Sequence, residues 1–143
     1  MKHEYKYSLE NLSTMVDTLK PFLDRANVVT LEGQLGAGKT TLVKEILSSY
    51  GITEDVTSPT FNYVNRYTAP DGRTFYHFDL YRLDDLDHFY SAGFDEYLYA
   101  SNSLSIIEWP ELVLSLVKEN VCKIQLEHVN KDERAMHLEC ISE

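Results

Sequence analysis

The 143-residue sequence is poor in the features that mark small disulfide-held or membrane proteins. It has two cysteines, Cys122 and Cys140, whereas small domains held together by disulfides usually carry more. Both lie in stretches that alternate apolar and polar residues, so we expect them to be reduced and partly buried. The N-terminus lacks the apolar run of a signal peptide, and no window approaches the roughly 18 apolar residues of a membrane span, so we expect a cytoplasmic protein.

Basic residues are also scarce, with 13 Lys and Arg against 23 Asp and Glu and a formal net charge of −10. Such a surface repels phosphate backbones over most of its area, so direct and extensive nucleic-acid binding is not expected. Glycine and proline occur singly and no linker or repeat is visible, which predicts one domain over residues 1–143.

The first half of the sequence predicts an edge strand, a helix, a buried strand and a second helix. The strand is expected at Glu4–Tyr7, and a helix follows Ser8, with Pro21 bending or ending it near its last turn. The run "NVVTLEG" is typical of a buried strand, and "TTLVKEILSSYG" predicts a helix closed by Gly51.

The second half predicts two hairpins around a helical segment and another buried strand. "TFNYVNRYT" and "RTFYHFDLY" flank a Pro-Asp-Gly turn, and "VCKIQLEHV" and "RAMHLECIS" flank "NKDE". Between them we expect helix from about Leu83 to Ala100, divided at Gly93, and then the strand "LSIIE". The fold class is therefore α/β, a three-layer sandwich like that of P-loop NTPases, with a mixed sheet that includes antiparallel hairpins.

The stretch "GQLGAGKTT" carries the strongest chemical signal. Gly33, Gly38, Lys39 and Thr40 occupy every fixed position of the P-loop pattern. In that pattern the backbone N–H groups face a phosphate, the lysine contacts the β- and γ-phosphates, and the threonine hydroxyl binds Mg²⁺. A glycine turn that merely joins two elements is the alternative, but the predicted strand before it and helix after it favour phosphate binding.

Two carboxylates follow predicted strands and are candidates for work near Mg²⁺. Asp79 ends the strand in "FYHFDLY", and Glu108 ends "LSIIE". Either one, taken alone, is equally well an ordinary solvated residue at a strand end. The phosphate loop favours the functional interpretation for both.

Several further residues are weaker candidates. The hydroxyls of Thr57, Ser58 and Thr60 follow the loop helix at a place where switch segments reach the γ-phosphate, although a Ser-Pro turn fits equally well. "NKDE" resembles the guanine-reading motif of GTPases but ends in Glu133, which favours ATP over GTP. The five histidines show no close metal-ligand spacing with the cysteines and no support for acyl-transfer chemistry.

The blocks "GQLGAGKTT", "TSPTF", "HFDLYRL" and "IIEWPE", in this order, resemble the TsaE family of bacterial ATPases. The resemblance implies Mg²⁺ and ATP as cofactors and slow ATP hydrolysis that partner proteins accelerate. It implies TsaB and TsaD as those partners, in forming threonylcarbamoyladenosine next to the anticodon of tRNAs that read codons beginning with A. The tRNA would be reached only through that complex, and no membrane is involved.

By matched position, the resemblance also assigns roles to single residues. Thr40 and Glu108 would hold Mg²⁺, Asp79 would orient the metal's water shell or the attacking water, and Thr60 would act as a switch-like hydroxyl. Arg134 is a plausible nucleotide contact. The phosphates would be wrapped by Gly33, Gly36, Ala37, Gly38, Lys39, Thr40 and Thr41.

Two other functions fit the same loop. In a nucleotide-gated binding module, ATP would order a partner surface and hydrolysis would be incidental. In a small kinase, the phosphoryl group would pass to a metabolite or a protein, although no arginine-rich lid segment follows the central hairpin.

Overall fold

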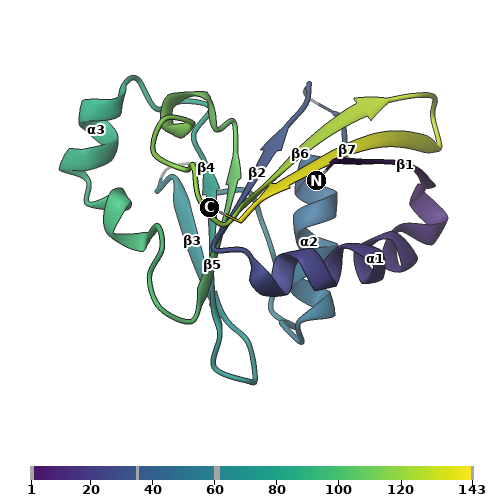
Figure 1. The fold of residues 1–143 in the computed structure, drawn as a ribbon, viewed down its shortest axis with the longest axis horizontal. Coiled ribbons are helices and arrows are strands. Elements are labelled where there is room, and N and C mark those ends of the chain that lie inside the picture. Colours follow the sequence, from purple (N-terminus) through teal and green to yellow (C-terminus); the bar gives the residue numbers. More distant parts are fainter. Residues whose placement is uncertain (1, 35, 60–61, 143) are drawn as a thin grey trace.

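A computed structural model describes residues 2–34, 36–59 and 62–142, and a seven-stranded mixed sheet runs through its centre (Figure 1). The strand order is β1-β7-β6-β2-β5-β4-β3. β2 pairs in parallel with β5 and β6, and β5 pairs in parallel with β4. β1 with β7, β3 with β4 and β6 with β7 are antiparallel, which confirms the mixed sheet and both hairpins. The strands are β1 (Lys2–Ser8), β2 (Val28–Glu32), β3 (Val64–Thr68), β4 (Thr74–Asp79), β5 (Ser103–Glu108), β6 (Val121–His128) and β7 (Glu133–Ile141).

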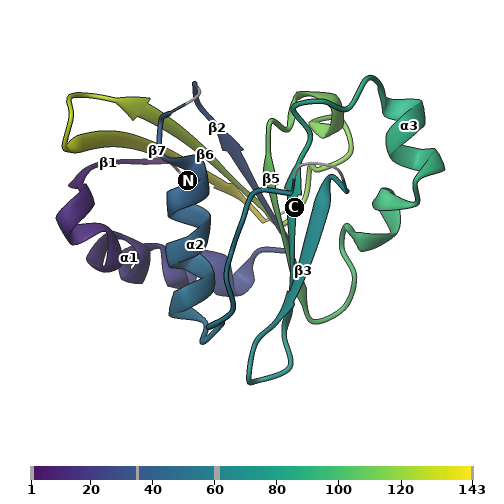
Figure 2. The same ribbon diagram turned by 180° about the vertical axis from the view of Figure 1, so that it is seen from behind.

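Helices cover the sheet from two sides, as Figures 1 and 2 show. α1 (Leu12–Arg25) and α2 (Lys39–Ser49) lie on one side, and α3 (Leu86–Ser91) lies on the other with the short 3₁₀ helix η2 (Phe94–Tyr97). Two further 3₁₀ helices are short. η1 (Leu9–Asn11) directly precedes α1, and η3 (Glu111–Val113) follows β5. None of the helices in the described ranges is long and apolar enough to cross a bilayer.

The sheet separates two hydrophobic cores, because successive side chains of a strand point to opposite faces. In β2, Val29 and Leu31 belong to the core under α1 and α2, whereas Val28 packs with Phe78 and Phe89 in the core under α3. Every residue of β5 is buried, as is typical of a strand covered on both faces. This arrangement confirms the predicted three layers.

Pro21 was expected to bend or end the first helix, and the structure excludes only the second alternative. α1 continues past Pro21 to Arg25, because the fully buried Leu23 anchors its last turn while Asp17, whose carbonyl loses its N–H partner, is solvent-exposed. The predicted helix over 83–100 is confined to α3 and η2, with Gly93 at φ +79° dividing them as expected. The turns on either side are not helical.

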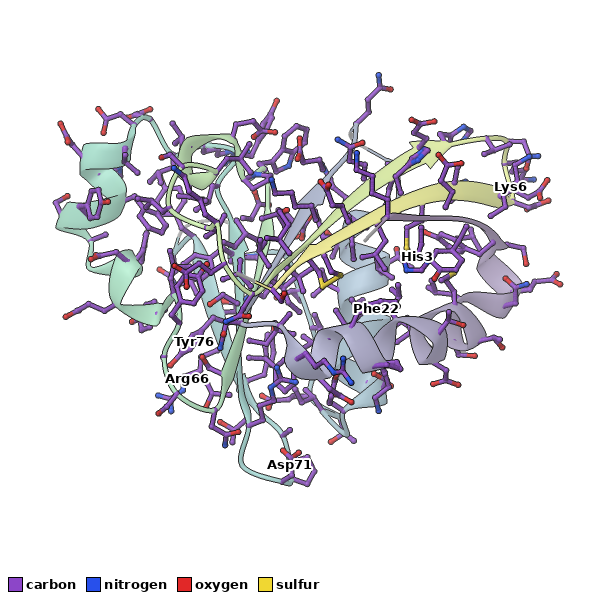
Figure 3. The ribbon with its side chains drawn as sticks, viewed as in Figure 1. His3, Lys6, Phe22, Arg66, Asp71 and Tyr76 are labelled. Carbon is purple, nitrogen blue, oxygen red and sulfur yellow. A yellow bond between two sulfur atoms is a disulfide. The ribbon has the colours of Figure 1, made fainter. Side chains whose placement is uncertain are left out.

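The cysteines form a disulfide, so the expectation that they are reduced was wrong (Figure 3). Cys122 of β6 and Cys140 of β7 are directly paired in the antiparallel ladder, with their Cα atoms 4.1 Å apart. The alternation of each strand placed both side chains on one face, but only the register of the hairpin makes them neighbours. Cys122 is buried and Cys140 half-buried, as expected.

Candidate functional site

The candidate site lies at the edge of the sheet where the parallel strands β2, β4 and β5 end. Glu32, Asp79 and Glu108 are the last residues of these strands, and the register pairs Asp79 with Glu108 and Leu31 with Glu108. The chain leaves β2 through the glycine loop, residues 33–38, and enters α2 at Lys39 (Figure 2). The carboxyl ends of parallel strands are the usual place for ligands in open α/β sheets.

Glycine is required at two positions of this loop for different reasons. A Cβ atom on Gly33 would lie 2.8 Å from the backbone oxygen of Leu126 in β6, so the loop lies too close to β6 for any side chain there. Gly38 has φ +97°, the left-handed conformation, and it caps the N-terminus of α2. The loop can therefore turn sharply and leave the first N–H groups of α2 at the edge of the sheet.

Lys39 directs its ammonium group back into the loop. The Nζ donates to the carbonyl of Gly33 at 2.6 Å and lies 3.3 Å from the ring centroid of Trp109, which follows β5. Burial lowers the pKa of Lys39, and the nearby carboxylates of Glu108, Asp79 and Glu111 partly oppose that effect. The ammonium group of Lys39 is thus partly buried between the Gly33 carbonyl and the face of the Trp109 ring.

Oxygen atoms gather around the hydroxyl of Thr40, the second residue of α2. The hydroxyl lies 3.3 Å from both carboxylate oxygens of Glu108 and 3.0 Å from the hydroxyl of Ser58. Hard oxygen donors of this kind suit Mg²⁺, which is usually held by one or two protein groups together with substrate phosphates. In the described ranges no group of three or more His, Cys, Asp or Glu residues is placed to hold a metal ion.

The carboxylate of Glu108 has a second partner, which the sequence patterns missed. The Nε2 atom of His77 lies 2.5 Å from Oε2 of Glu108, and both side chains are buried, with 0% and 3% of their surfaces exposed. The spacing of histidines and cysteines along the sequence does not indicate this contact. The available signal was the spacing of His77 and Asp79, two residues apart on one strand and hence on one face.

Asp79 lies beside Glu108 but has its own hydrogen bond. Its Oδ1 accepts from the backbone N–H of Tyr81 at 3.0 Å. Burial raises the pKa of Asp79, and the negative charge of Glu108 raises it further; the Tyr81 N–H, His77 and Lys39 act in the opposite direction. Asp79 is therefore a carboxylate at the site whose charged form is less favoured than usual.

Arg134, at the start of β7, supports the loop from the terminal hairpin. Its Nε donates to the carbonyl of Ala37 at 3.2 Å, and one NH group donates to the carbonyls of Asn130 and Glu133. The side chain is buried, and its Nε atom lies 3.8 Å from the point that a Cβ atom on Gly38 would occupy. The residue predicted as a nucleotide contact thus lies against the loop.

The structure brings most of the predicted site residues together. Gly33, Gly36, Ala37 and Gly38 form the loop, and Lys39 and Thr40 face Glu108 and Asp79 across it. Thr41 is an exposed residue in the first turn of α2, and Thr60 lies outside the described residues. A cavity of about 740 Å³ borders the loop where β6 ends, large enough for a small-molecule ligand.

Comparison with known proteins places this site in a family. The family model described as "Threonylcarbamoyl adenosine biosynthesis protein TsaE" matches residues 7–136. The chain belongs to the TsaE family. The TsaE protein of Rickettsia conorii is 35% identical over 128 residues, covering 89% of this chain and 71% of that protein. The TsaE protein of Bacillus subtilis is 37% identical over 114 residues, covering 79% and 69%.

A solved structure agrees with the family assignment. The crystal structure of YdiB from Bacillus subtilis superposes with a TM-score of 0.76 at 26% identity, covering 99% of this chain and 87% of that one. The TsaE family acts in tRNA threonylcarbamoyladenosine biosynthesis, and the expected family and fold class are therefore confirmed. The contacts of the site described above all lie within residues 7–136, the segment that matches the TsaE family model.

Proposed function

We propose that this TsaE-family chain binds Mg²⁺–ATP at the glycine loop and hydrolyses it to ADP and phosphate during formation of threonylcarbamoyladenosine on tRNA. The observation that carries the proposal is the convergence of the Thr40 hydroxyl and the buried Glu108 carboxylate at 3.3 Å, beside the lysine of the loop. A glycine turn that only joined a strand to a helix would have no need to bury a carboxylate there, since an unpaired buried charge is costly.

Each residue of the site has a definite task in this proposal. The N–H groups at the start of α2 and the ammonium of Lys39 would bind the phosphates. Thr40 and Glu108 would hold Mg²⁺, which would neutralise the charge that develops on the phosphate oxygens. Asp79 would accept a hydrogen bond from a water molecule of the metal's shell or from the attacking water.

ATP binding would require Lys39 to change partners. In the structure the ammonium contacts the Gly33 carbonyl and the Trp109 ring. To reach a phosphate it must exchange at least the Gly33 carbonyl for a phosphate oxygen. The stronger charge-assisted hydrogen bonds to phosphate would favour that exchange.

We also propose that turnover depends on the protein partners TsaB and TsaD. Phosphoryl transfer commonly uses an arginine that stabilises the transition state. In the described part of the chain, Arg134 is the arginine in contact with the loop, and it donates to three backbone carbonyls. A partner could supply the missing positive charge, and the net charge of −10 fits a chain that reaches tRNA only through a complex.

A nucleotide-gated binding module is a second candidate, favoured by the surroundings of Trp109. The ring of Trp109 contacts Lys39 and also Tyr81, whose ring centroid lies 4.8 Å away with the two rings tilted by 51°; Tyr81 is 56% exposed. Movement of Lys39 toward a phosphate would alter this aromatic contact at the surface. ATP binding could then change a docking surface without hydrolysis.

One experiment separates the two candidates. ATP turnover is measured with Mg²⁺ for the chain alone and with TsaB and TsaD, and tRNA modification is measured in the same mixtures. A Glu108→Gln variant that binds ATP, does not hydrolyse it and fails to support modification would support the ATPase. The same variant supporting full modification would support the binding module. Glu139→Gln, which changes a half-buried carboxylate of β7 that lies 3.8 Å from the ammonium of Lys2, is the matched control.

A further inference from the structure

We propose that His77 is a positioning residue, which holds the carboxylate of Glu108 in the orientation that faces Thr40. The inference rests on the proposed function, since it gives Glu108 the task of holding Mg²⁺. It adds a residue that neither the loop pattern nor the family blocks assigned to the site. The contact that carries it is the 2.5 Å approach of His77 Nε2 to Glu108 Oε2 in the buried core.

The sheet explains why these two side chains meet. β4 and β5 are parallel neighbours, and the register pairs His77 with Ile106 and Asp79 with Glu108. The residue paired with His77 lies two positions before Glu108, so His77 and Glu108 are diagonal neighbours on the same face of the sheet. A long side chain can span that diagonal distance. Ile106 belongs to the core under α1 and α2, so this is the face of the sheet that α2 covers, and Thr40 is the second residue of α2.

The carboxylate of Glu108 is thus bonded from two different elements. Thr40 approaches it from α2, and His77 approaches it from β4. A carboxylate held at one point can rotate about its side-chain bonds, whereas one held by two rigid elements has a fixed direction. Groups that hydrogen-bond a metal-ligating side chain commonly change metal affinity by about 10-fold to 100-fold.

The other nitrogen of the ring indicates which tautomer His77 adopts. Among the described residues Nδ1 has no hydrogen-bond partner, although it is fully buried. A carboxylate oxygen can only accept a hydrogen bond, so the ring nitrogen that faces Glu108 must carry a hydrogen, and Nδ1 then needs no buried acceptor. The proton therefore belongs on Nε2, where it is donated to Glu108.

Two substitutions of similar polarity test the positioning role. The amide nitrogen of Gln lies at the same reach from the backbone as Nε2 of His, whereas that of Asn lies at the reach of Nδ1. His77→Gln should keep the bond to Glu108, and His77→Asn should lose it. Asn is therefore the test variant and Gln the matched control.

The readout is the ratio of ATP affinity with Mg²⁺ to ATP affinity in EDTA, measured by calorimetry. We expect this ratio to fall about 10-fold in His77→Asn and to return to within about 3-fold of the wild type in His77→Gln. ATP affinity in EDTA should stay the same, which a merely disturbed core would not allow. A wild-type ratio in folded His77→Asn, or an equal loss in EDTA, would overturn the proposal.

A second comparison tests the path through Glu108. In a Glu108→Ala background, His77→Asn should cause no further loss in the ratio, because the carboxylate that it positions is gone. Independent losses from the two changes would contradict the proposal. If the wild-type ratio itself were near one, Mg²⁺ would make no contribution at this site, and the proposed function would fail together with the inference.

A measurement on the unmodified protein does not depend on how the variants fold. The ¹⁵N resonances of the His77 ring should show hydrogen on Nε2, and they should shift when Mg²⁺–ATP is added but less with ATP in EDTA. Hydrogen on Nδ1, or resonances that ignore Mg²⁺, would overturn the positioning role.

Discussion

The parallel centre of the sheet buries one histidine–glutamate contact, whereas its antiparallel margin exposes another to solvent. At the centre, His77 and Glu108 lie 2.5 Å apart with 0% and 3% of their side-chain surfaces exposed. At the margin, His137 of β7 lies 3.3 Å from Glu4 and 3.6 Å from Glu127, and the three side chains are 39%, 80% and 67% exposed. The chemical groups are the same, but their surroundings are opposite.

The difference in burial predicts which of these groups act at the site and which are ordinary surface groups. Exposed ion pairs contribute about 0–1 kcal/mol to stability, because water solvates each partner almost as well. Buried pairs of polar or charged groups lose their hydration, and apolar residues in their place would often give an equally stable fold. We therefore propose that the buried groups at the centre serve ligand binding, and changes there should affect binding first.

The largest expected effect comes from Lys39. Lys39→Ala should lower ATP affinity about 100-fold, because it removes charge-assisted hydrogen bonds to phosphate. Threonylcarbamoyladenosine formation should fail with it. The control is Lys44→Ala, which removes an exposed lysine from the same helix. Normal tRNA modification by Lys39→Ala would count heavily against an ATP-dependent role.

The disulfide of the margin should affect stability without affecting the site. The bond between Cys122 and Cys140 closes a short loop, with a sequence separation of 18 residues. Its reduction should lower the free energy of unfolding by about 3 kcal/mol and leave ATP affinity unchanged. Denaturant melts with and without a thiol reductant measure the first, and calorimetry measures the second. Two free thiols in the unreduced, denatured protein would show that the bond is absent.

Replacing Asp79 at the centre should have the opposite effect to reducing the disulfide: stability should rise and ATP turnover should fall. Its pKa is raised on folding, so its stabilising contribution is complete below the unfolded pKa and is lost as the pH rises through the folded value. At neutral pH the charged group opposes folding, and Asp79→Asn should raise the free energy of unfolding. The gain should stay below about 1 kcal/mol, because the group is only half-buried.

Melts of the two proteins from acid to neutral pH check that sign. The stability difference in favour of Asp79→Asn should grow as the pH rises, while ATP turnover by the variant falls. A variant that is less stable than the wild type at neutral pH would show that the Asp79 charge is better satisfied than its burial indicates.

The sequence was sufficient for those parts of the site that depend on local order, and insufficient for those that depend on register. Strand, glycine loop and helix follow one another, so the positions of Lys39 and Thr40 could be predicted. The carboxyl ends of parallel strands share an edge, so Asp79 and Glu108 could be placed near them. The contacts of His77 with Glu108, and of Cys122 with Cys140, arise between strands whose relative register no local pattern encodes.

The contact of Lys39 with Trp109 also depends on how elements that are distant in the sequence are placed relative to each other. The position of Trp109 over the lysine depends on where β5 ends relative to α2. Its backbone has φ +55°, an uncommon conformation for a residue of this size, which no propensity would predict. Long-range packing decides such contacts.

The smallest expected effect belongs to the exposed histidine of the margin. His137→Gln removes the ring that lies between Glu4 and Glu127, yet water already solvates all three groups. The free energy of unfolding should change by less than about 0.5 kcal/mol, and the ratio of ATP affinities with and without Mg²⁺ should not change. His77→Gln keeps a hydrogen-bond donor beside Glu108 and therefore does not test the contact. The decisive comparison is between His77→Asn and His137→Asn. A loss of Mg²⁺ dependence in both would mean that burial does not distinguish the two contacts, and that histidine substitutions act on the fold as a whole.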